Sequence, residues 1–141
     1  MPTLTIEFTA SASLGGETLG PDIIKAITIG ETIHDKIVNV AGATNATYQT
    51  IWDSSVDSPT TFQFGAVIAD PKNQVATEKF VDVRITVNAI TPIFRVSTFT
   101  GALALGKSAQ GTGAITKIEV ANIAGTVVTT DDVLVRIVLW K

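Results

Sequence analysis

The chain has 141 residues and a formal net charge of −3, with 45% hydrophobic residues, 16% charged residues and no cysteine. The absence of cysteine excludes disulfides, thiol catalysis and thiolate metal sites. Lys and Arg are scattered singly, which excludes a basic surface for nucleic acid. The chain contains no run of about 18 apolar residues, so no membrane-spanning helix is predicted. Length predicts a single domain over residues 1–141, and the low charge predicts a surface that meets partners.

The N-terminal region predicts two strands separated by a loop. Apolar residues occupy every second position of Leu4–Ala12, and this period of two indicates a half-buried strand. Gly15–Gly16 and Gly20–Pro21 then interrupt the pattern and predict a loop. Lys25–Ile29 is rich in β-branched residues, which favours a strand, although Pro21–Asp22 would also suit the start of a short helix.

The rest of the chain continues as short apolar or alternating runs bounded by turn residues. The predicted strands are Ile33–Ala41, Ala46–Trp52, Thr61–Ala69, Val81–Asn88, Ile93–Thr100, Ala102–Leu105, Ala114–Ile123 and Val133–Trp140. No amphipathic helix pattern interrupts them. The chain is therefore predicted to be all-β, an antiparallel β-sandwich that is jelly-roll-like with about eight or nine strands. A Greek-key immunoglobulin-like sandwich is the nearest alternative, although its Cys–Trp–Cys marker is absent.

Val133–Trp140 is apolar on both faces except at Arg136. A strand of this kind is central in a sheet, covered on both faces or at an interface. We therefore predict a subunit interface that includes Leu134, Val138 and Trp140.

Gly101–Ser108 matches the phosphate-binding pattern G-x-x-x-x-G-K-S. In that motif a helix begins at the Lys-Ser pair and directs its N-terminus at the phosphate. Here Gly111 and Gly113 follow within two turns, and glycine inside a helix costs about 1 kcal/mol each. The pattern therefore predicts a strand followed by a turn, and no nucleotide is expected.

No arrangement of side chains predicts catalysis, a metal or a cofactor. His34 is the one histidine, and Asp35 beside it would point to the opposite face of a strand, so the two form no dyad. Asp53–Ser58 and Thr130–Asp132 carry oxygen ligands, but neither has the pattern of a calcium loop. Both are predicted to be solvated turns, and the protein is predicted not to be an enzyme.

Three large aromatic residues are candidates for recognition, namely Tyr48, Trp52 and Trp140. Tryptophan is usually largely buried, so the core is the first expectation for both tryptophans and a protein interface the second. The alternative is a carbohydrate-binding β-sandwich module, in which Tyr48 and Trp52 form an exposed platform that stacks on sugar rings. Such a module would be extracellular or carried on a virion.

The stretches Gly113–Asn122 and Val133–Leu139, together with the Thr/Ala/Val/Ile-rich strands and the low-charge surface, resemble the small jelly-roll or β-sandwich structural proteins of tailed-phage virions. The resemblance implies capsid decoration or a fibre part, a homotrimer or higher homo-oligomer, and a capsid or other virion protein as partner. Met1–Thr5 lacks the basic start of a signal peptide, so a virion location is expected without secretion.

Overall fold

The computed structural model describes residues 3–8, 12–14, 17–19, 23–28, 33–41, 47–71, 78–99, 101–110, 113–122 and 132–141. The chain divides into two compact units, Met1–Glu31 and Thr32–Lys141. The single domain over residues 1–141 stays a prediction. Within the described ranges all regular structure is β, without a helix, and so no helix there could cross a membrane.

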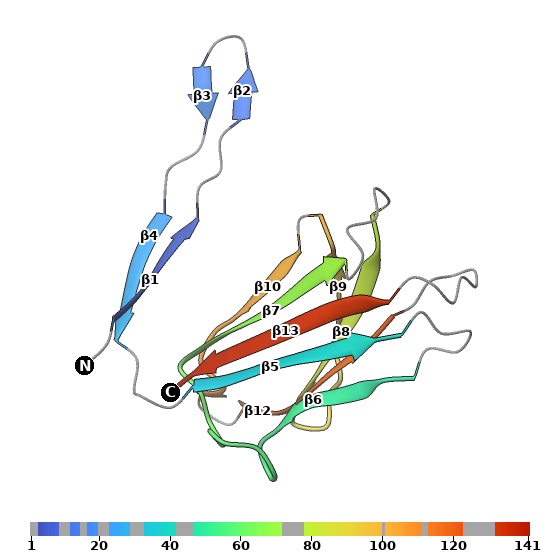
Figure 1. The fold of residues 1–141 in the computed structure, drawn as a ribbon. Helices are drawn as coiled ribbons and strands as arrows, with labels where there is room; N and C mark the ends of the chain where they lie inside the picture. Colours follow the sequence, from blue (N-terminus) through green and yellow to red (C-terminus); the bar gives the residue numbers. More distant parts are fainter. Residues whose placement is uncertain are drawn as a thin grey trace. The chain divides into compact units, whose positions relative to one another are not determined.

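The first unit contains two antiparallel strand pairs. β1 (Thr3–Phe8) pairs with β4 (Ile23–Thr28), and β2 (Ala12–Leu14) pairs with β3 (Glu17–Leu19) (Figure 1). β1 covers Leu4–Phe8 of the first predicted strand, and β4 covers Lys25–Thr28 of the second. Residues 9–11 of the first lie outside the described part, and Ala12 belongs to β2. The stretch predicted as a loop contains the rest of β2 and the short β3, which pair with each other.

The second unit is built from strands that match the predicted runs to within a few residues at their ends, with the short β11 in addition. They are β5 (Ile33–Val40), β6 (Gln49–Asp53), β7 (Phe64–Pro71), β8 (Phe80–Val87), β9 (Ile93–Ser97), β10 (Ala102–Leu105), β11 (Ala109–Gln110), β12 (Gly113–Ala121) and β13 (Val133–Trp140). One sheet has the order β10-β7-β13-β5. The other has the order β9-β8-β12, with both β6 and the short β11 on the far side of β12.

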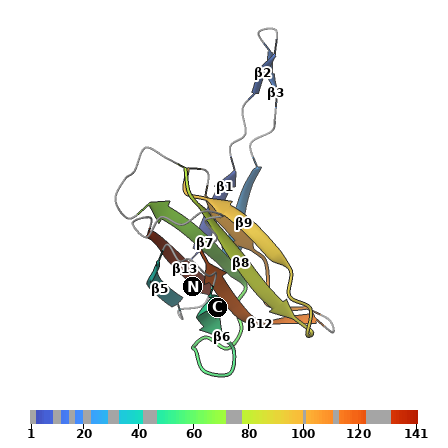
Figure 2. The same ribbon diagram turned by 90° about the vertical axis from the view of Figure 1, so that its right-hand side faces the viewer.

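The strand order is that of a jelly roll. Apart from β11, the strands pair as a nested set: the first with the last (β5 with β13), then β6 with β12, β7 with β10, and β8 with β9. Two further antiparallel pairings, β13 with β7 and β12 with β8, join these hairpins into the two sheets. Figures 1 and 2 show the sheets as two layers. The prediction of an antiparallel, jelly-roll-like β-sandwich is therefore confirmed for this unit.

The core lies between the two sheets and follows the alternation of the strands. In β13 every second residue is fully buried, and these residues are Val133, Val135, Ile137 and Leu139. The other sheet contributes alternate apolar residues of β12 and β8 to the same core cluster, among them Ile118, Val120, Val81 and Val83. Burial of this apolar surface is the main term that stabilises the fold.

Candidate functional site

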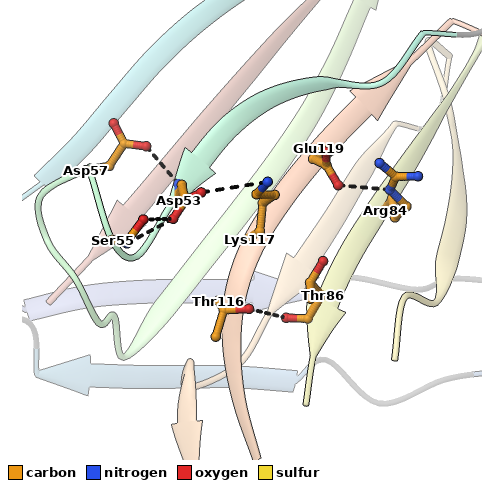
Figure 3. Close-up of polar contacts among 8 residues, drawn as sticks. All are labelled: Asp53, Ser55, Asp57, Arg84, Thr86, Thr116, Lys117 and Glu119. Atoms are coloured by element: carbon orange, nitrogen blue, oxygen red, sulfur yellow. Dashed lines mark hydrogen bonds and ion pairs between the residues drawn. The ribbon is translucent and has the colours of Figure 1, made fainter. Parts of the chain in front are cut away.

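A polar hollow lies on the outer face of the sheet formed by β6, β12 and β8. Figure 3 shows most of the polar side chains that line it. Its volume is about 630 Å³. The backbone pairing brings Lys117 of β12 opposite Asp53 of β6, and Glu119 opposite Arg84 of β8. The lining residues are Asp53, Ser54, Ser55, Arg84, Thr86, Thr91, Thr116, Lys117 and Glu119.

Two irregularities in strand pairing border this hollow. Ile118 and Glu119 of β12 pair with Trp52 and Thr50 of β6, so that Ile51 is left as an extra residue. In the pairing of β12 with β8, Thr116 is skipped in the same way. Bulges bend a strand and redirect its side chains, and they are common next to functional sites.

The charged side chains of the hollow are arranged as pairs. Arg84 Nε donates to Glu119 Oε2 at 2.9 Å, and the guanidinium lies over the ring of Tyr48, 3.9 Å from the ring centre. The hydrogen bond to Glu119 raises the pKa of Arg84 above its ordinary value. Lys117 Nζ lies 3.8 Å from Asp53 Oδ2, which is too long for a hydrogen bond.

The turn after β6 is held by two carboxylates. Asp53 Oδ1 accepts hydrogen bonds from the backbone N–H of Ser55 at 2.9 Å and from its hydroxyl at 2.6 Å. These bonds lower the pKa of Asp53. Asp57 Oδ2 accepts from the N–H of Asp53 at 2.8 Å. Both carboxylates therefore stabilise the turn itself. In the part of the chain that the structure describes, no group of three or more His, Asp or Glu residues is placed so that it could hold a metal ion. Thr130 and Asp131 lie outside that part.

The outer face of the other sheet is largely apolar. Ile37 is 61% exposed, Ile33 52% and Ile68 38%. They surround β13, whose even-numbered residues point outward because the odd-numbered ones fill the core. One charged pair crosses this face: Arg136 binds Asp35 through two hydrogen bonds, of 2.9 and 2.6 Å, and this lowers the pKa of Asp35.

The three predicted interface residues differ in exposure. Leu134 and Trp140 are half-buried, and Leu134 borders a hollow of about 270 Å³ together with Ile37, Ile68, Asp70 and Arg136. Trp140 stacks on Phe64 with ring centres 5.5 Å apart. Val138 is only 8% exposed. It lies on the outward side of the strand but offers almost no surface to a partner. The exposed apolar surface around it is instead provided by Ile37 and Ile68 of the neighbouring strands.

The predicted platform of Tyr48 and Trp52 is not formed, because Trp52 lies in the core. Its side chain is completely buried, its Nε1–H donates to the carbonyl of Pro59 at 3.0 Å, and its ring meets Phe62 edge-to-face at 5.3 Å. Tyr48 is half-buried beneath Arg84. No ring face of Trp52 is available to a sugar in solution, and the core interpretation of this residue is the correct one.

The stretch that matches the phosphate-binding pattern has a structural role. Its apolar residues form β10, and no helix begins at Lys107–Ser108. The buried Ser108 hydroxyl accepts the N–H of Phe62 at 2.8 Å, and the Ser108 N–H donates to the Phe62 carbonyl at 2.9 Å. The prediction of a strand followed by a turn is confirmed. The two hydrogen bonds of Ser108 connect this turn to Phe62, in the segment before β7.

We expect Ser108→Ala to lower the free energy of unfolding by about 1–3 kcal/mol, because the buried N–H of Phe62 would lose its acceptor. Urea titration followed by circular dichroism measures the change. Lys107→Ala is the matched control, since Lys107 is exposed. An equal effect of the two substitutions would contradict this role for Ser108.

His34 and Asp35 form no dyad, as the strand alternation predicts. The two ring nitrogens of His34 lie 3.2 and 3.3 Å from the carbonyl oxygens of Ser58 and Ile51, whereas Asp35 binds Arg136. His34 therefore links β5 to the segment that contains β6 and its following turn.

The fold and these two faces define an antiparallel jelly-roll sandwich with one apolar and one charge-paired outer surface. No protein-family model matches the chain, and no curated protein matches it significantly.

Proposed function

We propose that this chain is a non-enzymatic structural protein of a tailed-phage virion, which decorates and stabilises the capsid through contacts with copies of itself and with the capsid surface. The observation that carries the proposal is the apolar outer face of β5, β13 and β7, with Ile33, Ile37 and Ile68 exposed. Large apolar side chains exposed on one face of a protein are typical of an interaction site, and here they flank the Asp35–Arg136 pair. The virion as location comes from the sequence resemblance.

The partner proposed for this face is a second copy of the chain. The face carries both charges of the Asp35–Arg136 pair, each about half exposed. When two copies meet through this face, Arg136 of one copy can reach Asp35 of the other, so the face is complementary to itself in charge as well as in apolar character. Repeated copies would then hold a capsid surface with an avidity that exceeds each single contact.

The test of self-association is the substitution Ile33→Asp, measured as solution mass by light scattering. The wild-type chain is expected to be a homo-oligomer, with a mass of at least two chains. Ile33 lies opposite Trp140, and a carboxylate placed in an apolar contact costs several kcal/mol, so Ile33→Asp should weaken association by about 100-fold or more. Because Ile33 is exposed within its own subunit, the free energy of unfolding of the monomer should not fall.

Val56→Asp is the matched control, because Val56 is 81% exposed and lies in the turn after β6, a strand of the other sheet. It should leave the mass unchanged. A wild-type chain that is monomeric at all concentrations would contradict self-association. Retention of the chain on purified capsids, and its loss in the Ile33→Asp variant, would test the virion partner.

A further inference from the structure

We propose that the polar hollow on β6, β12 and β8 binds a neutral glycan, whose hydroxyl groups sit between the paired charges. A hollow of about 630 Å³ is within the usual range of small-molecule sites, roughly 300–1,000 Å³. It lies on the other sheet from the apolar face. This activity is therefore separate from the proposed assembly role and does not depend on it.

The charges of the hollow cancel one another. Two carboxylates, Asp53 and Glu119, and two cations, Arg84 and Lys117, line it. Each carboxylate faces a cation, Glu119 at 2.9 Å from Arg84 and Asp53 at 3.8 Å from Lys117. An anion or a metal ion would have to compete with one of these pairs and leave a charge without its partner. A neutral ligand leaves both pairs in place.

Lys117 and Asp53 are spaced so that one hydroxyl group beside the pair can contact both of them. Their 3.8 Å separation exceeds the roughly 2.7–3.2 Å of an ordinary hydrogen bond. A hydroxyl can donate one hydrogen bond while it accepts another. An oxygen about 2.8 Å from both atoms would accept from the ammonium group and donate to the carboxylate, and such charge-assisted hydrogen bonds are roughly twice as strong as neutral ones.

Arg84 supplies a second, rigidly held group of donors. Its Nε is bound to Glu119 and its plane lies over Tyr48, so the direction of its terminal nitrogens is set before a ligand arrives. A group that is already ordered loses little entropy on binding. Tyr48 is thus a positioning residue and not a stacking platform. Three threonines, Thr86, Thr91 and Thr116, are also among the lining residues.

The test is a glycan array probed with the labelled full chain, followed by titration of the best neutral glycan. Lys117→Met removes the ammonium donors but keeps the aliphatic stem. Lys36→Met is the matched control, because Lys36 is an exposed lysine of β5 in the other sheet. We expect binding to at least one neutral glycan, a loss of about tenfold or more in Lys117→Met, no change in Lys36→Met, and no competition by inorganic sulfate.

Thr86→Val is a second variant, which removes a hydroxyl at nearly constant shape and should also weaken binding. The unfolding midpoint of each variant shows that the fold is intact. An array with no neutral glycan bound, binding confined to acidic glycans, or equal affinity in Lys117→Met and Lys36→Met would overturn the proposal. Solution mass, measured in the same variants, should stay that of the wild type, so failure of this site is distinguishable from failure of the assembly surface.

Discussion

Trp52→Ala is expected to lower the free energy of unfolding by about 3–5 kcal/mol, the usual cost of truncating a buried tryptophan. The side chain is completely buried between the sheets and contacts Phe62 edge-to-face. Its removal leaves a cavity, and the carbonyl of Pro59 loses its hydrogen-bond donor. Because whole domains are stable by only about 5–15 kcal/mol, this loss is a large part of the total and should clearly lower the urea concentration at the unfolding midpoint. Urea titration by circular dichroism gives the value.

Trp140→Ala is the control, since Trp140 is only half-buried on the outer side of β13. It should cost clearly less than Trp52→Ala. Trp52→Phe should fall between the two, because an aromatic ring remains while the hydrogen bond to Pro59 is lost. If both tryptophans cost the same on truncation, the assignment of Trp52 to the core would be wrong.

Gly101→Ala is expected to destabilise the fold by about 3 kcal/mol. A Cβ at this position would overlap the carbonyl oxygen of Ser97 and lie 3.1 Å from that of Ala69. Both are backbone atoms, so no change of rotamer relieves the contact. The carbonyl of Gly101 also accepts the N–H of Ala69 at 3.1 Å, which means that moving the chain away would strain this hydrogen bond. Thermal unfolding should show a midpoint lower by roughly 10 °C.

Gly106→Ala provides the comparison within the same stretch, because a Cβ at Gly106 would meet nothing within 4 Å. Its expected effect is close to zero, or a slight gain from the lower entropy of the unfolded chain. A phosphate-binding loop would need both glycines for its ligand. In this structure only Gly101 is required for stability, because only there would a Cβ overlap the backbone. A large loss of stability in Gly106→Ala would contradict this assignment.

The architecture was predictable because most strands carry an unambiguous alternation. Val81–Asn88 shows the alternating apolar positions that the core uses, Val133–Trp140 is a nearly continuous apolar run, and turn residues separate the runs. The pairing of β5 with β13 was beyond such reasoning, because local patterns contain no information about which distant strands lie side by side. The short β3 was missed for a related reason, since glycine and proline around it hide a three-residue strand.

The mistaken platform has a definite cause in the bulge of β6. Counting by twos places Tyr48 and Trp52 on one face, but Ile51 is an extra residue in the pairing with β12. The alternation therefore changes at this point, and Ile51 and Trp52 are both fully buried. A single sequence does not reveal where a bulge lies.

The polar hollow was missed although parts of its pattern were visible. Arg84 and Thr86 alternate with buried residues of β8, and Lys117 and Glu119 occupy β12. Each pair alone is typical of a solvated strand face. Only the register between β6, β12 and β8 brings Asp53, Arg84 and Lys117 around one hollow.

The position of β13 in the middle of its sheet has a consequence for biosynthesis. This strand lies between β7 and β5 and contributes fully buried side chains to the core along its whole length. Until residues 133–140 have left the ribosome, β5 lacks the strand that joins it to β7, and the opposite sheet lacks part of its cover. The sandwich can therefore be completed only after β13 has emerged. Folding is then expected in the millisecond-to-second range typical of folds dominated by distant pairings. Until that point the apolar strands are exposed and need protection from aggregation.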